Sequence, residues 1–316
     1  MTQTDYSGVV SGYPDRMSAA PAPEVPFGRM LTAMATAFHA DGSVDLEQTA
    51  AIASHLVDHG HDGVVVSGTT GESATTSDVE NADILRAVRD AVGGRASVVA
   101  GVGTNATPHS VELARQAEKL GVDGLLLVTP YYSKPSQAGV LHHFTEVARA
   151  TEVPVMLYDV PGRTGTTISL ATYEGAAALD TVVAVKDATG DFARGVRLLD
   201  LGYAVYSGDD HAHLGWLAHG ACGFVSVAGH ACGRELASLA ESFLAGDHTG
   251  ALDLYRRLLP TFDAMMSVPN YGATTAKAAL ELLGVIDNRH VRSPLLPLDE
   301  TEVAALRDGL AASGLL

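Results

Sequence analysis

Short apolar runs alternate with longer segments of helical periodicity from about residue 30 onward. The runs are apolar throughout, as in VVVSG and LLLVTP, which is typical of parallel strands buried on both faces. They recur about every 20–35 residues, the spacing of a βα unit. The pattern predicts strands at 30–36, 63–67, 97–102, 124–129, 154–159, 182–186, 204–207 and 223–227.

The segments between the runs are predicted to be amphipathic helices. Segment 107–121 has Thr107 as a candidate cap and Gly121 as a candidate end. In segment 45–60 one stripe at helical spacing contains Leu46, Ala50, Ala53, Leu56 and Val57. Eight βα units in succession predict an α/β fold, a (β/α)8 TIM barrel rather than a doubly wound sheet.

The barrel pattern accounts for only part of the chain. We expect the barrel to occupy residues 27–234 and an extension of several C-terminal helices, packed on the barrel, to occupy residues 235–316. Residues 1–26 are rich in Ser, Pro, Gly and Ala and are predicted to form a mobile tail. No secretory signal and no long apolar run is present, so we expect a cytoplasmic protein without a membrane segment.

Composition narrows the possible functions. Twenty Lys and Arg against 37 Asp and Glu give a net charge of −17, which argues against binding nucleic acid or an anionic membrane. Apolar residues make up 47% of the chain, enough for a large core. Cys222 and Cys232 are too few for a disulfide framework or a four-thiolate zinc site, and we interpret them as buried thiols.

Candidate chemistry lies where barrels place it, at the carboxyl ends of the strands. Lys186 ends the apolar run VVAVK, where desolvation would lower its pKa and favour the neutral amine that forms Schiff bases. The alternative is a structural lysine paired with Asp187 or Asp210. Tyr158 ends the preceding strand and should lie beside Lys186, either as a proton shuttle or as a packing residue.

Two further features are suited to anions. The turn 68–71 (GTTG) presents two hydroxyls and free N–H groups, suitable for a carboxylate or phosphate, but lacks the GK[ST] ending of a P-loop. Arg163 could clamp a carboxylate or form a surface ion pair.

The 13 histidines do not predict a metal site. His55 and His59 lie four apart on a helix that we expect to face solvent, and His211 and His213 lie two apart. No H-E-x-x-H arrangement accompanies either pair, so we expect no metal.

Five motifs occur in barrel order: GTTGES (68–73), VTPYY (128–132), YDVPGRTG (158–165), KDATG (186–190) and SGDD (207–210). Together they resemble the dihydrodipicolinate synthase/N-acetylneuraminate lyase family of class I aldolases, from about residue 27 to the C-terminus. Arg163 makes the chain most similar to the synthase branch. The resemblance implies a lyase that condenses pyruvate with aspartate semialdehyde to 4-hydroxy-tetrahydrodipicolinate in lysine and diaminopimelate biosynthesis.

Two alternatives stay open beside this activity. One is another pyruvate-dependent aldolase or dehydratase of the family, acting on a sugar acid or hydroxy-oxo acid. The other is a catalytically silent paralogue that binds a keto acid.

The resemblance also implies residue roles. Lys186 would form an imine with pyruvate, and no metal or organic cofactor would be needed. Thr70 and the turn N–H groups would bind the pyruvate carboxylate, and Arg163 the second substrate. The expected proton relay contains Tyr158, Thr69 and Tyr132, and the pyruvate pocket is lined by Gly208 and the carbonyl of Val225. Tyr132 would reach into a neighbouring subunit of a homotetramer, a dimer of dimers.

The chain departs from the family pattern in places. Asp159 replaces an Asn and Asp187 stands where Glu is common, so Asp159 adds negative charge near a site for two carboxylates unless it is paired or points away. Segment 269–277 differs in length, and no role is carried over to it.

The family's lysine-inhibition site is matched only in part. Ser73, Ala74, Asn105 and Tyr131 fit its pattern, whereas Asp78, Asn81 and His109 replace two histidines and a glutamate. We expect weak or absent inhibition by lysine.

Overall fold

The computed structural model of the chain describes residues 25–316. The predicted tail, residues 1–26, therefore lies outside the described residues except for its last two. Within the described part, no helix is long and apolar enough to cross a membrane.

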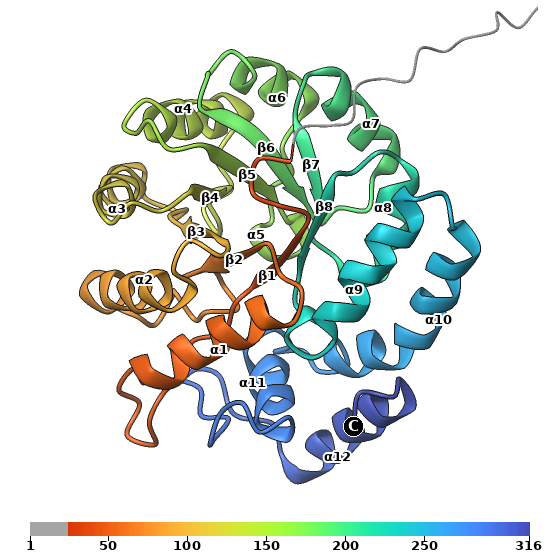
Figure 1. Ribbon diagram of the computed structural model, residues 1–316. Helices are drawn as coiled ribbons and strands as arrows, with labels where there is room; N and C mark the ends of the chain where they lie inside the picture. The colour runs from red at the N-terminus through yellow and green to blue at the C-terminus, as the bar shows by residue number, and fades with distance from the viewer. Residues whose placement is uncertain (1–24) are drawn as a thin grey trace, which may run out of the picture.

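Eight parallel strands close into a barrel in sequence order, β1 to β8, with β8 pairing back onto β1 (Figure 1). The predicted fold class is confirmed. The strands are β1 Met30–Ala33, β2 Gly63–Val66, β3 Ser97–Gly101, β4 Gly124–Val128, β5 Val155–Asp159, β6 Val182–Asp187, β7 Ala204–Ser207 and β8 Gly223–Ser226.

The prediction for the first strand ran three residues too far. After Ala33 the chain leaves the sheet, and the Ala35 N–H donates to Nε2 of His230 at 3.0 Å instead of to a strand.

Helices surround the barrel on its outer face (Figure 1). They are α1 Leu46–Asp58, α2 Asp78–Val92, α3 Thr107–Lys119, α4 Gln137–Ala148, α6 Leu170–Ala176, α7 Phe192–Asp200, α8 His213–Ala218 and α9 Gly229–Leu244. Two short turns, α5 Pro161–Thr164 and the 3-10 turn η1 Asp210–Ala212, lie instead at the carboxyl ends of β5 and β7. Side-chain caps begin several of them, including Asp45 on α1 and Ser77 with Glu80 in a capping box on α2.

Two helix details differ from expectation. The N-cap of α3 is Ala106, and the hydroxyl of Thr107 instead hydrogen-bonds Nδ1 of His143 at 2.9 Å, so the predicted Thr107 cap is wrong. The buried face of α1 contains Ile52 together with the predicted Ala53 and Leu56, whereas Leu46 is 39% exposed.

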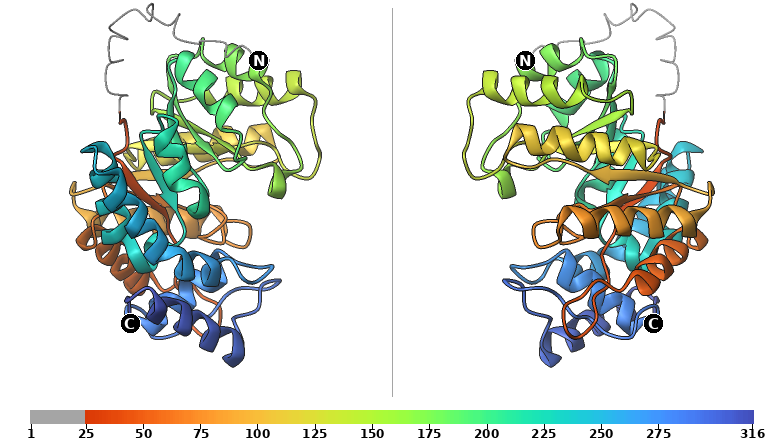
Figure 2. Two further views of the ribbon diagram at one scale, coloured as in Figure 1. Left: turned by 90° about the vertical axis from the view of Figure 1, so that its right-hand side faces the viewer. Right: turned by 90° about the vertical axis from the view of Figure 1, so that its left-hand side faces the viewer.

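Three further helices complete the chain: α10 His248–Met265, α11 Ala273–Leu282 and α12 Glu300–Ala312. The side views in Figure 2 show the last part of the chain, in blue, gathered at one end of the molecule. The division predicted at residue 235 falls inside α9, which has a kink at Cys232. That domain boundary stays a prediction.

Alternation along the strands separates the barrel interior from the layer under the helices. Inside, Leu126, Met156 and Ala184 belong to one apolar cluster that fills the barrel. Two positions further along β5 and β6, on the same face, stand Tyr158 and Lys186. The apolar layer therefore forms a floor beneath these two polar side chains.

A buried ion pair ties the C-terminal extension to the turn after β2. Lys277 of α11 is 0% exposed, and its Nζ lies 2.5 Å from Oε1 of Glu72 and 2.7 Å from the His290 carbonyl. Oε2 of Glu72 accepts from the Arg292 N–H at 2.8 Å. Glu72 has φ +58°, a conformation that costs energy for a side chain of this kind. The pair therefore fixes the end of the GTTGES segment.

Removing one partner of this pair should destabilise the protein strongly. Lys277→Met leaves the Glu72 carboxylate buried without its cation, and we expect a loss of about 3–5 kcal/mol in the free energy of unfolding, measured by urea titration. Replacing both residues, in Lys277→Met with Glu72→Leu, should recover much of the loss.

The matched control is Arg256→Ala, which breaks an exposed pair with Asp253 and should cost under about 1 kcal/mol. Equal losses of unfolding free energy in Lys277→Met and Arg256→Ala would show that the buried pair stabilises the fold no more than an exposed pair does.

Candidate active site

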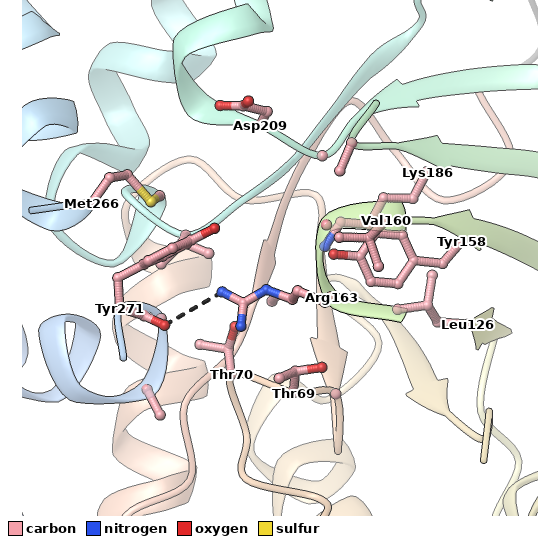
Figure 3. A pocket seen from close by; sticks show the side chains of 18 of the residues that line it. Thr69, Thr70, Leu126, Tyr158, Val160, Arg163, Lys186, Asp209, Met266 and Tyr271 are labelled. Carbon is pink, nitrogen blue, oxygen red and sulfur yellow. Dashed lines mark hydrogen bonds between the residues drawn. The ribbon is translucent and has the colours of Figure 1, made fainter. Parts of the chain in front are cut away.

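A cavity of about 500 Å³ opens at the carboxyl ends of the strands (Figure 3). Its wall combines strand ends, the turn after β2 and the segment between α10 and α11. Prominent lining residues are Thr69, Thr70, Leu126, Tyr158, Arg163, Lys186, Gly208, Asp209, Met266 and Tyr271. The barrel order thus brings together most of the residues predicted for catalysis and binding.

Lys186 stands in one wall of this cavity. Tyr158 and Lys186 are register partners on β5 and β6, and Nζ lies 4.3 Å from the centroid of the Tyr158 ring. Across residues 25–316 no salt bridge to Lys186 is found. Asp187 binds Arg194 and Asp210 binds His213, so the structural alternative for Lys186 is not what the geometry shows.

Burial sets the protonation of both groups. It lowers the pKa of Lys186 to about 7, with Asp210 opposing and Arg163 assisting the shift. Near neutral pH a large share of Lys186 is therefore the nucleophilic free amine. Burial also raises the pKa of Tyr158 above its usual value, so its phenol keeps its proton.

Gly208 leaves the space that Lys186 needs. A Cβ at this position would lie 2.9 Å from Cε and 3.0 Å from Cγ of Lys186. Val225 is different, because it is fully buried in the barrel interior and Val227 takes its place in the cavity wall. The structure thus brings Gly208 to the cavity and leaves Val225 behind the wall.

The turn after β2 presents an anion-binding surface. Its ends are fixed by bonds from the Glu72 N–H to the Thr69 carbonyl and from the Ser73 N–H to the Gly68 carbonyl. The N–H groups of Thr69 and Thr70 have no acceptor among the described residues, and both residues line the cavity. Free N–H groups beside a threonine hydroxyl suit a carboxylate.

Arg163 stands across the cavity from the barrel wall. No carboxylate pairs with it in the described part of the chain, so a surface ion pair is not formed there. Its guanidinium carbon lies 4.6 Å from the centroid of the Tyr271 ring, and Nη2 donates to the Tyr271 carbonyl at 3.5 Å (Figure 3). The cation therefore faces the cavity without a counter-ion.

The charge of Asp159 is directed away from the cavity. Nη2 of Arg194, at the first turn of α7, lies 3.1 Å from Oδ2 of Asp159 and 2.8 Å from Oδ2 of Asp187. Asp159 also accepts from the Tyr173 hydroxyl at 3.3 Å. Burial raises the pKa of Asp159 to about 6, against the effect of Arg194. The departure from the family motif thus leaves the cavity free of this charge.

Sequence reasoning missed Arg194, although it is the first basic residue after β6 and two buried acids at adjacent strand ends need a cation. It also missed Met266 and Tyr271, which line the cavity from the C-terminal extension, and it gave no cavity role to Asp209 and His211 of the β7 loop. No local pattern marks Met266 and Tyr271 as neighbours of the strand ends.

Comparison with known proteins agrees with this geometry. The model of the dihydrodipicolinate synthetase family matches residues 26–313. The chain belongs to this family. A 4-hydroxy-tetrahydrodipicolinate synthase of Kineococcus radiotolerans is 54% identical over 299 residues, 94% of this chain and 97% of the relative. The 4-hydroxy-tetrahydrodipicolinate synthase 2 of Streptomyces coelicolor is 50% identical, and the match covers 94% of this chain and 99% of the relative.

Solved structures of the dihydrodipicolinate synthetase family share the fold. The enzyme from Cyanidioschyzon merolae, solved with lysine bound, has a TM-score of 0.89 and 38% identity, covering 93% of this chain and all of that one. The chloride-inhibited enzyme from Acinetobacter baumannii, solved with pyruvate, has a TM-score of 0.87 and 34% identity. The match covers 92% of this chain and all of that one. The predicted family membership is confirmed.

Tyr132, which the family resemblance places in the relay, does not line this chain's own cavity. It is 91% exposed with φ +71°, and its N–H bonds the Thr164 carbonyl at 3.4 Å. It lines instead an adjoining cavity of about 970 Å³, whose wall shares Thr69, Tyr158 and Arg163 with the first.

That second cavity gathers most residues of the family's lysine-site pattern. Asp78 and His109 face each other there, with Nε2 3.0 Å from Oδ1, and Asn81 accepts from the Thr76 hydroxyl at 2.9 Å. Asn105 is not in its wall. The lining residues from the predicted set are Ser73, Ala74, Asp78, Asn81, His109 and Tyr131.

The histidines singled out in the sequence are occupied by protein contacts. His55 lies partly buried against α9, 3.3 Å from the His230 carbonyl, so the expected solvent-facing orientation is wrong. His211 binds Asp263 and His213 binds Asp210. Among residues 25–316 no three metal-binding side chains gather. Cys222 and Cys232 are free and buried, as interpreted.

The lowered pKa of Lys186 predicts an unusual reactivity profile. At limiting formaldehyde, reductive methylation of Lys186 should rise with pH up to about 7–8 and then level off, because the amine is then fully neutral. Peptide mass spectrometry follows each site, with the exposed Lys119 as the internal comparison. Methylation of Lys186 that kept rising to about pH 10, the range of an ordinary lysine, would contradict the shift.

Proposed function

We propose that the protein condenses pyruvate with aspartate semialdehyde to form 4-hydroxy-tetrahydrodipicolinate through an imine on Lys186. One observation carries the proposal: a desolvated amine lies in one cavity with two separate carboxylate-binding groups, the Thr69–Thr70 turn and Arg163. Pyruvate and aspartate semialdehyde each bring one carboxylate. The shared name of the relatives supports the same activity.

The first half of the reaction builds a nucleophile from pyruvate. Neutral Nζ of Lys186 attacks the keto carbon, and loss of water gives the imine. Thr70 and the free N–H groups of the turn hold the carboxylate. The imine acidifies the methyl group, which loses a proton to the relay of Tyr158 and Thr69. The resulting enamine carries the carbanion equivalent without a metal or organic cofactor.

The second half joins the acceptor and releases the enzyme. The enamine carbon attacks the aldehyde of aspartate semialdehyde while Arg163 holds its carboxylate, and the relay returns a proton to the new alkoxide. The amine of the acceptor then attacks the imine carbon, closes the ring and expels the Lys186 amine. One water is released over the cycle. Gly208 keeps room beside the Lys186 side chain for these tetrahedral intermediates.

An assembly of several chains would complete the relay. The exposed Tyr132 would enter the site of a neighbouring subunit, in a homotetramer built as a dimer of dimers. The tetramer and the cytoplasmic location stay predictions.

A coupled assay tests the reaction. Purified protein receives pyruvate and aspartate semialdehyde with excess downstream reductase, and NADPH consumption is followed. Turnover should vanish in Lys186→Ala and persist in the exposed Lys119→Ala. Tyr158→Phe should lower kcat by about 10²–10⁴-fold, the usual weight of a proton-transfer group, while the pyruvate imine is still trapped by borohydride.

The other outcomes separate the alternatives. If there is no turnover but the pyruvate imine is still trapped, aspartate semialdehyde is not the second substrate. Sugar acids and hydroxy-oxo acids would then be screened. No borohydride adduct on Lys186 would indicate a catalytically silent keto-acid-binding protein.

Lysine should inhibit this protein weakly or not at all. Asp78 in the second cavity is already paired with His109, so an incoming ammonium would have to displace that contact. Loss of one charged hydrogen bond weakens binding by about 10–100-fold. Near-complete inhibition at low-millimolar lysine in the coupled assay would contradict this expectation. Asp78→Ala serves as the comparison and should respond to lysine no more strongly.

A further inference from the structure

One wall of the catalytic cavity comes from outside the barrel. Between α10 and α11 the chain passes the mouth of the barrel and contributes Met266, Pro269, Tyr271 and Gly272 to the lining. In Figure 3 the Tyr271 side chain lies on the far side of the cavity from Lys186, with Arg163 between them. The extension thus closes the cavity at the end where the acceptor would enter.

Tyr271 holds Arg163 by two contacts from one residue. The guanidinium carbon lies 4.6 Å from the ring centroid, within cation–π range, and Nη2 reaches the backbone carbonyl at 3.5 Å. Nη1 and Nε have no partner among the described residues. The contacts therefore fix one edge of the guanidinium and leave the rest of its donors for a carboxylate.

The next residue, Gly272, lies near both anion-binding groups. Gly272 has φ +106°, where side chains are strained, and a Cβ there would lie 3.8 Å from Oγ1 of Thr70 and 4.0 Å from Nη2 of Arg163. The backbone at Gly272 therefore passes close to both groups without a side chain that contacts either.

We propose that Tyr271 is a positioning residue that pre-orients Arg163 for the acceptor carboxylate. A free arginine side chain samples many rotamers, and ordering it on binding costs affinity. The Tyr271 ring supplies that order before the acceptor arrives. This inference rests on the proposed function.

A double-mutant cycle between Tyr271 and Arg163 tests it. Tyr271→Leu should raise the KM for aspartate semialdehyde about 3–10-fold, the weight of a partly exposed cation–π contact and its ordering effect. The KM for pyruvate and the yield of borohydride-trapped imine should stay at wild-type values. Tyr271→Phe should restore the acceptor KM, because the ring face remains. In an Arg163→Met background, Tyr271→Leu should have no further effect.

Controls separate this inference from the reaction itself. Leu296→Ala, an exposed change in the same extension, should leave both KM values unchanged. An acceptor KM unchanged in Tyr271→Leu, a parallel rise in the KM for pyruvate, or an equal effect of Tyr271→Leu with and without Arg163 would each overturn the inference. Absence of wild-type turnover would reject the proposed function and this inference with it, whereas wild-type turnover followed by any of the three results rejects the inference alone.

Discussion

The chemistry of this site depends on keeping a lysine amine out of water and without a counter-ion. The apolar floor of Leu126, Met156 and Ala184 supplies the dry surroundings. Three carboxylates lie at or just after the ends of β5, β6 and β7, and each is bound to another group in the fold. Arg194 binds Asp159 and Asp187, while His213 and Ser226 bind Asp210. The reactive state of Lys186 is therefore a property of the surrounding ion pairs as much as of its own position.

The C-terminal extension is part of the active site and not an appendage. It reaches the mouth of the barrel at two places, through the buried Lys277–Glu72 pair beneath the carboxylate-binding turn and through Tyr271 beside Arg163. A barrel alone would hold Lys186 and Tyr158 but would leave the turn unsupported and the acceptor end open. The active site therefore draws residues from both sides of residue 235.

The sequence predicted well whatever depends on local periodicity. All eight strands, the barrel and the pairing of Tyr158 with Lys186 follow from apolar runs and the barrel rule. Contacts between distant segments could not be predicted, because nothing local marks them: Arg194 and Tyr271 are examples. The same limit explains the smaller errors, since Thr107 found a partner in His143 instead of capping its helix. Shared motifs supplied the residue roles that periodicity could not.

The Glu72–Lys277 ion pair also affects the order in which parts of the chain reach their final structure during synthesis. Glu72 and Lys277 are separated by 205 positions along the chain. During synthesis on the ribosome, all eight strands emerge before the cation that Glu72 requires, and a carboxylate without its partner resists burial. The carboxylate-binding turn is therefore among the last parts of the nascent chain to reach its final form. A nascent chain that ends before α11 lacks the cation that holds Glu72, so catalytic competence waits for the residues of α11.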